Sequence, residues 1–132
     1  MQQWLAVFIG AVIQMALGMF WYSPVGFGKP WMREMNIKMD NKSKKGMGKY
    51  YLAAFVGSIL TAFVLSRVIV LTGARSAGAG AATGILLWLG FVVPIMLGSV
   101  LWERKSVKLY IINVGYYLVS MTIIGAVIGG LV

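Results

Sequence analysis

The sequence lacks cysteine and histidine and has few acidic residues. Only three acidic residues are present, Glu34, Asp40 and Glu103. Disulfides, thiol catalysis and cysteine-based metal sites are therefore excluded, and the commonest general base and metal ligand is missing. A catalytic carboxylate pair or a carboxylate metal cage would have to come from these three acids alone. We therefore predict that the chain is not an enzyme and holds no metal and no cofactor.

Charge of either sign is also scarce. Charged residues make up 11% of the 132 residues, whereas 60% are hydrophobic. Ordinary soluble domains are about 45–50% apolar and about 25% charged. A chain this short cannot bury so much apolar surface in a soluble core, so the expected partner is a lipid bilayer. The formal net charge of +9 is then explained by membrane topology, and we do not expect nucleic-acid binding.

Four apolar segments are long enough to cross a bilayer, which takes roughly 20 residues in a helix. They cover about residues 4–22, 50–71, 80–102 and 109–132 of a single transmembrane domain, 1–132. Apolar residues run continuously in these segments rather than alternating, so we predict helices and reject a transmembrane barrel. The expected fold class is an all-α membrane protein with four transmembrane helices.

Basic residues gather on one side of these four spans. Ten of the twelve Lys and Arg residues lie in the loops after the first and third spans, and an even number of helices separates the two loops. The positive-inside rule then predicts an inner (cytoplasmic) membrane protein with both loops in the cytoplasm and both termini outside. The first apolar run has no basic segment before it, so we expect it to be retained rather than cleaved as a signal peptide.

The cytoplasmic loop, residues 23–49, is the one extended polar segment. Pro30 suits the first turn of a short helix, and Trp31, Met35 and Met39 would then share one face. This pattern predicts a short interfacial amphipathic helix. The basic run that follows is expected to face anionic lipid headgroups.

Uncharged polar side chains form a candidate polar core within the spans. Gln14 lies in the middle of the first span, Ser58 and Thr61 share one face of the second, and Asn113, Tyr117 and Ser120 share one face of the fourth. Neutral amides and hydroxyls can coordinate a cation or a small polar solute. They can equally bond only to one another, because polar groups in lipid need partners. The sequence leaves both interpretations open.

Two further features stand out within the spans. Arg67 is the one charge inside a predicted span, where it can reach the lipid headgroups or bind an anion inside the bundle. Pro94 has no N–H, so the carbonyl of Gly90 loses its helical partner and a kink is predicted there. A carbonyl freed in this way can also coordinate an ion.

Small residues recur at four-residue steps in the last two spans. Gly80-x-x-x-Gly84 and Gly125-x-x-x-Gly129 indicate close helix contact, either within the chain or between copies. Four short helices enclose little space, and we therefore expect a homo-oligomer. The first two spans and the last two spans form two helical hairpins that cross the membrane in the same order of directions. They also share some residues at a constant offset in the sequence. This likeness reflects either duplication of a hairpin or chance similarity between apolar helices.

Several short motifs occur in a recognisable order. Residues 21–31 read WYSPVGFGKPW, residues 86–92 read LLWLGFV, and residues 108–116 read KLYIINVGY. Together they resemble an uncharacterised prokaryotic membrane family, the domain of unknown function "seventeen sixty-one", over nearly the whole chain. The resemblance implies a small multi-helix membrane protein and carries over no activity, substrate or site.

These observations favour one function over another. The first hypothesis is an oligomeric channel or transporter-like protein for a small ion or solute, with the candidate polar core along its path. The alternative is a structural or regulatory membrane protein that binds a partner helix or lipid. Flux across liposome membranes would separate the two.

Overall fold

The computed structural model describes residues 2–36 and 48–132, and every regular element among them is helical. Four segments are long and apolar enough to cross a membrane: Gln3–Trp21, Gly48–Thr72, Ala77–Leu101 and Val107–Leu131. Each begins and ends close to a span predicted from hydropathy. The expected all-α architecture with four spans is confirmed, and the chain is a multi-pass membrane protein.

The helices follow one another with short connections outside the first loop. The elements are α1 (Gln2–Trp21), α2 (Gly28–Met35), α3 (Gly48–Thr72), α4 (Ala77–Leu87), the π-helical η1 (Trp88–Val92), α5 (Val93–Met96), α6 (Gly98–Leu101) and α7 (Val107–Leu131). Helices α4 to α6 and η1 together form the third span. The Ser76 and Ser106 side chains cap α4 and α7 by accepting hydrogen bonds from the backbone N–H groups of Ala79 and Leu109.

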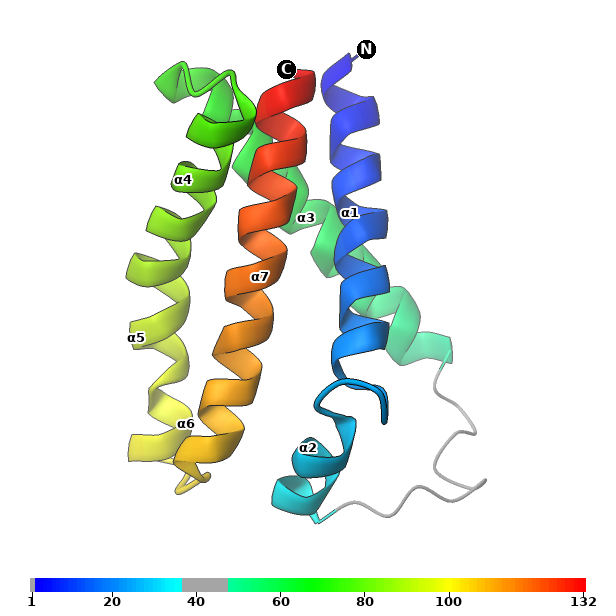
Figure 1. Cartoon of the computed structure of the whole chain (residues 1–132), viewed down its shortest axis with the longest axis vertical. Coiled ribbons are helices and arrows are strands. Elements are labelled where there is room, and N and C mark those ends of the chain that lie inside the picture. The colour runs from blue at the N-terminus through cyan, green and yellow to red at the C-terminus, as the bar shows by residue number, and fades with distance from the viewer. Residues whose placement is uncertain (1, 37–47) are drawn as a thin grey trace.

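Helix α7 is the central element of the bundle. It packs against α1 on one side and α4 on the other, and it also contacts α2 and α3. Figure 1 shows α1, α7 and the α4–α6 rod standing side by side, while α3 crosses behind them at an angle. Both termini lie at one end, which we call the terminal end. Helix α2 and the turn between α6 and α7 lie at the other, which we call the loop end (Figure 1).

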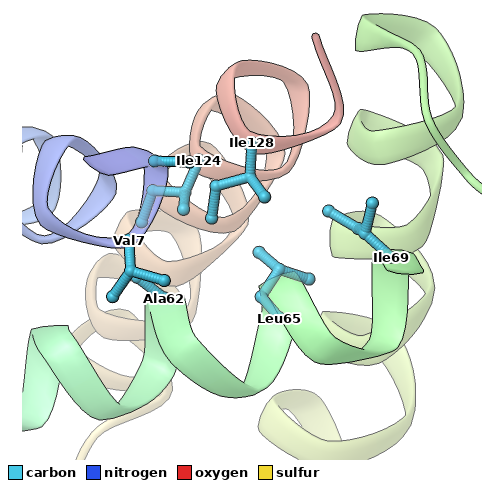
Figure 2. Packing of buried hydrophobic residues seen from close by; sticks show 7 residues of the cluster. Val7, Ala62, Leu65, Ile69, Ile124 and Ile128 are labelled. Atoms are coloured by element: carbon cyan, nitrogen blue, oxygen red, sulfur yellow. The ribbon is translucent and has the colours of Figure 1, made fainter. Parts of the chain in front are cut away.

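The apolar core lies where α1, α3 and α7 meet, in the half of the bundle nearer the terminal end. Its fully or almost fully buried members are small or β-branched residues and one leucine (Figure 2): Ala6, Val7, Ala62, Leu65, Ile69, Ile124 and Ile128. These side chains leave the centre of the bundle filled at this level. We refer to them as the aliphatic core.

The contact between α4 and α7 is built on glycine. A Cβ atom added to Gly80 would overlap the carbonyl oxygen of Gly125, and one added to Gly84 would overlap that of Met121. Gly129 faces the start of α4 in the same way. Both small-xxx-small motifs therefore pair with each other inside one chain, and backbone meets backbone at this contact.

The third span departs from α-helical geometry just before its proline. Residues Trp88–Val92 form a π-helical turn, in which the N–H of Val93 donates to the carbonyl of Trp88, five residues back. Pro94 follows at once, and Gly90 lies within the turn with no neighbouring atom within 4 Å of an added Cβ. The irregularity expected at Gly90 and Pro94 is thus a π-helical turn, which widens the helix so that the proline ring can be accommodated.

Candidate functional site

The segment that follows α1 forms a compact turn. The N–H of Phe27 donates to the carbonyl of Trp21 at 2.6 Å, and that of Gly28 donates to the carbonyl of Ser23 at 2.9 Å. A Cβ on Gly28 would lie 2.5 Å from the Ser23 oxygen, and one on Gly26 would lie 2.6 Å from a carbonyl oxygen of α1. The two glycines of the WYSPVGFGKPW element are therefore needed for close approach of the backbone to itself.

This turn is attached to α7 by two hydrogen bonds from aromatic side chains. Trp21 Nε1 donates to the carbonyl of Ile112 at 3.0 Å, and the Tyr22 hydroxyl donates to Asn113 Oδ1 at 2.7 Å. Trp31, on α2, packs edge-on against Tyr22 with 5.3 Å between ring centroids. Helix α2 is thus folded back against the loop end of α7, where its Trp31 is half-buried.

Aromatic rings fill the space between α1, α2 and α7 at the loop end. Tyr116 lies 5.6 Å from Tyr22 and 4.9 Å from Tyr117, and Trp21 lies 4.6 Å from Phe27, all between ring centroids. We call these residues and Trp31 the aromatic cluster. At these distances the rings make edge-to-face and tilted contacts, which are worth about 0.5–1.5 kcal/mol per pair beyond the area they bury.

Aromatic donors also tie the spans together through backbone carbonyls. The Tyr116 hydroxyl donates to the carbonyl of Gln14 at 2.8 Å, Trp88 Nε1 donates to that of Val114 at 2.8 Å, and the Tyr110 hydroxyl donates to that of Val93 at 2.6 Å. A helical carbonyl has a second lone pair that can accept such a bond. These bonds satisfy polar groups that lipid cannot.

Two glycine contacts define how α1 faces α7. A Cβ on Gly10 would lie 3.0 Å from Ile124 Cγ2 and 3.3 Å from Ala62 Cβ, on α3. A Cβ on Gly18 would lie 3.0 Å from the Tyr116 oxygen. Because residues four apart lie on one helix face, the two turns of α1 between these glycines face the two turns of α7 between residues 116 and 124.

Gln14 and Ser120 occupy the middle of that contact. Ser58 lies four residues before Ala62 in α3, which is about one helical turn nearer the loop end. The exposed fractions of Gln14, Ser58 and Ser120 are 5%, 5% and 0%. The two serine hydroxyls donate to carbonyls of their own helices at 3.0 and 3.4 Å, which leaves their oxygens able to accept. Gln14 Oε1 is buried with no hydrogen-bond partner among the described residues. We call these three residues the polar level.

The structure does not bring the predicted polar core together in one place. Gln14 and Ser120 lie in the polar level, while Asn113 is half-buried and bonded to Tyr22 nearer the loop end. Tyr117 belongs to the aromatic cluster through its ring. Thr61 is half-buried and donates to the carbonyl of Gly57 in its own helix at 3.0 Å. These residues therefore do not form one cluster.

The remaining predicted residues lie near the surface. Arg67 is exposed and lines a shallow groove between α1 and α3 at the terminal end. Gly90 and Pro94 are exposed on the third span, and a Cβ added to Gly90 would meet no atom within 4 Å. Met39 lies outside the described residues. Within residues 2–36 and 48–132 no group of three or more His, Cys, Asp or Glu side chains is placed to hold a metal ion.

Sequence reasoning placed Ser58 and Thr61 together in the candidate polar core and did not select the aromatic donors as site residues. Ser58 shares the face of α3 that carries the small and aliphatic core residues Ala62, Leu65 and Ile69, whereas Thr61 is turned off it. That periodicity could have distinguished the two hydroxyls. The bonds from Trp21 and Trp88 to α7 carbonyls had no sequence signal, because any helical carbonyl is an equally plausible acceptor.

Fold and site together define a helical membrane protein of four spans, with an uncharged polar level between an aliphatic core and an aromatic cluster. The family model described as "Protein of unknown function (DUF1761)" matches residues 5–129. The chain belongs to this family, as the resemblance over nearly the whole chain predicted. No curated protein and no solved structure matches the chain.

Proposed function

We propose that the protein holds a small ion or polar solute at the polar level and passes it across the membrane, as a channel or transporter-like protein. The observation that carries this proposal is Gln14 Oε1. A buried amide oxygen without a partner in a bilayer costs free energy unless a ligand, an ion or a water molecule satisfies it. The other buried polar side chains that could line a path already donate to carbonyls.

The chemistry of the polar level limits the cargo. It offers neutral oxygen atoms from one amide and two hydroxyls, which suit a monovalent cation or a small solute with hydrogen-bond donors. The aliphatic core covers this level toward the terminal end, and the aromatic cluster covers it toward the loop end. A cargo held here would be closed off from both sides, so passage requires one cover to move.

The glycine contacts remove one reason for expecting a homo-oligomer. Gly84 and Gly129 pack within the chain, and Gly10 packs against Ile124 and Ala62 of the same chain. The proposed position of the cargo therefore lies inside a single copy and needs no second one. A homo-oligomer stays a separate prediction, which mass measurement in nanodiscs tests: a single copy in every lipid composition would contradict it.

The proposal is tested by flux into sealed liposomes that contain the purified protein. Gln14→Leu should abolish uptake of K⁺, read with an entrapped fluorescent indicator, and uptake of glycerol, read by light scattering. Thr61→Val is the matched control, because it removes a hydroxyl from a neighbouring position outside the polar level. Wild-type liposomes that pass neither probe, or equal flux in Gln14→Leu and wild type, would contradict transport.

The second candidate is a structural or regulatory membrane protein that binds a partner helix or lipid. The specific observation in its favour is that the aromatic donors satisfy carbonyls across α1, α5 and α7, as expected of a bundle held together for its own sake. On this candidate Gln14→Leu leaves the bundle as stable as before or more stable, because an unpartnered buried oxygen is removed. Thermal unfolding of the same variant measures this.

A further inference from the structure

The groove between α1 and α3 at the terminal end is lined by both apolar and polar side chains, including one arginine. It has a volume of about 340 Å³ and is lined by Gln3, Trp4, Val7, Phe63, Ser66 and Arg67. Trp4 and Phe63 stack with 5.8 Å between ring centroids and form an apolar wall. The Ser66 hydroxyl donates to a carbonyl of its own helix, and the residue is almost fully buried. The open polar groups are thus Arg67 and Gln3.

Arg67 brings a positive charge into a groove of the bilayer-spanning region. It lies five residues before the end of α3 at Thr72, which is roughly 7–8 Å along a helix axis. The described acids, Glu34 and Glu103, lie in α2 and after α6, at the loop end (Figure 1). No described Asp or Glu side chain is therefore near enough to neutralise the guanidinium, and a bound anion is a natural counter-charge.

We propose that this groove binds an anionic phospholipid, with its phosphate on Arg67 and the Gln3 amide and one acyl chain against Trp4 and Phe63. The charge of the groove complements a phosphate, which a guanidinium binds with paired N–H donors. Its apolar wall complements an acyl chain. A groove that combines the two at headgroup depth matches one lipid molecule and not a water-soluble anion, which would leave the apolar wall uncovered.

The test compares lipid retention by native mass spectrometry of the full chain in mild detergent. Wild type should retain phosphatidylglycerol over phosphatidylcholine, and Arg67→Gln should lower phosphatidylglycerol retention about five-fold. Arg67→Lys should keep most of it. Arg75→Gln is the matched control, because Arg75 is the other basic residue near the terminal end and does not line the groove. Equal losses in Arg67→Gln and Arg75→Gln would overturn the proposal, because they would mean unspecific attraction to charge.

Two further measurements place the lipid. Phosphatidylglycerol with brominated acyl chains should quench the part of the emission that Trp4→Phe removes, and Arg67→Gln should weaken that quenching. Millimolar glycerol phosphate should not displace the lipid. Displacement by glycerol phosphate would assign the site to a soluble phosphate instead, and an absence of Trp4 quenching would show that the lipid binds elsewhere. Either result overturns the assignment, and neither bears on flux through the polar level.

Discussion

Individual polar residues in this protein mostly bond to backbone carbonyls or across one helix contact. Tyr22 and Asn113 are the one described pair whose side chains bond to each other across two segments far apart in the sequence. In a membrane such a bond contributes little net free energy, because the partly unfolded chain in lipid also finds partners for its polar groups. The pair should therefore position the turn after α1 more than it stabilises the bundle.

A double-mutant cycle tests this expectation. Tyr22→Phe and Asn113→Leu each remove one partner, and we expect a coupling free energy of about 0.6 kcal/mol, the average for interhelical hydrogen bonds in membranes. Unfolding in mixed micelles at increasing denaturant fraction measures it. Tyr51→Phe is the control, because Tyr51 is exposed near the same end of the bundle. A coupling near zero would mean that the bond does not persist in the folded protein.

At the scale of helices, the α4–α7 contact should be the least tolerant of added volume. Gly80→Ala pushes a methyl group into the carbonyl of Gly125, so we expect it to lower the free energy of unfolding by about 1–3 kcal/mol. Gly57→Ala is the matched control, because nothing lies within 4 Å of its added Cβ. It should raise stability by about 0.4–1 kcal/mol, since alanine restricts the unfolded chain. Equal changes in the free energy of unfolding for the two variants would contradict a close contact between α4 and α7 within one chain.

The turn before α2 offers a second test at this scale. Gly28→Ala places a methyl group 2.5 Å from the Ser23 carbonyl oxygen, so the turn must open and α2 must leave α7. The emission of Trp31, taken as the difference from Trp31→Phe, should then shift to the red, because its ring loses its contact with Tyr22. Gly48→Ala, where an added Cβ meets no atom within 4 Å, should leave that emission unchanged. A red-shifted Trp31 in wild type would contradict docking itself.

Hydropathy predicted where the membrane-spanning helices lie in the sequence, but it did not predict which residues of these helices contact one another. The spans were predictable because each helix must cover about 30 Å of hydrocarbon with apolar residues, whatever packs against it. The glycine motifs indicated a close contact, but only the fold shows that Gly80 meets Gly125 within one chain. Likewise, Gln14 was predictable as a buried amide, whereas the burial of Ser58 rather than Thr61 depends on how α3 crosses α1. Such partner choices arise from three-dimensional packing, which one sequence does not encode in a local pattern.

At the scale of the whole molecule, the fold reduces the topology to one choice between two orientations. Figure 1 places the start of α1 and the end of α7 at one end, and α2 and the α6–α7 turn at the other, so the bundle inserts either with its loop end in the cytoplasm or the reverse. Arg104 and Lys105 lie in the α6–α7 turn and Lys108 at the start of α7, while Lys29 and Arg33 lie in α2 and Lys49 at the start of α3. We infer that the loop end faces the cytoplasm, because Lys and Arg near span ends resist translocation.

Reporter fusions test this orientation directly. Alkaline phosphatase, which is active only outside the cytoplasm, should be active when fused after Val132 and inactive when fused after Lys105. A green fluorescent protein should give the opposite pair of results. Replacing Arg104, Lys105 and Lys108 by glutamine should weaken the preference, because the positive charge beside the third and fourth spans is lost, whereas replacing Arg67 and Arg75 should strengthen it. Phosphatase activity after Lys105 together with silence after Val132 would reverse the orientation. The phospholipid proposed for the Arg67 groove would then lie in the cytoplasmic leaflet.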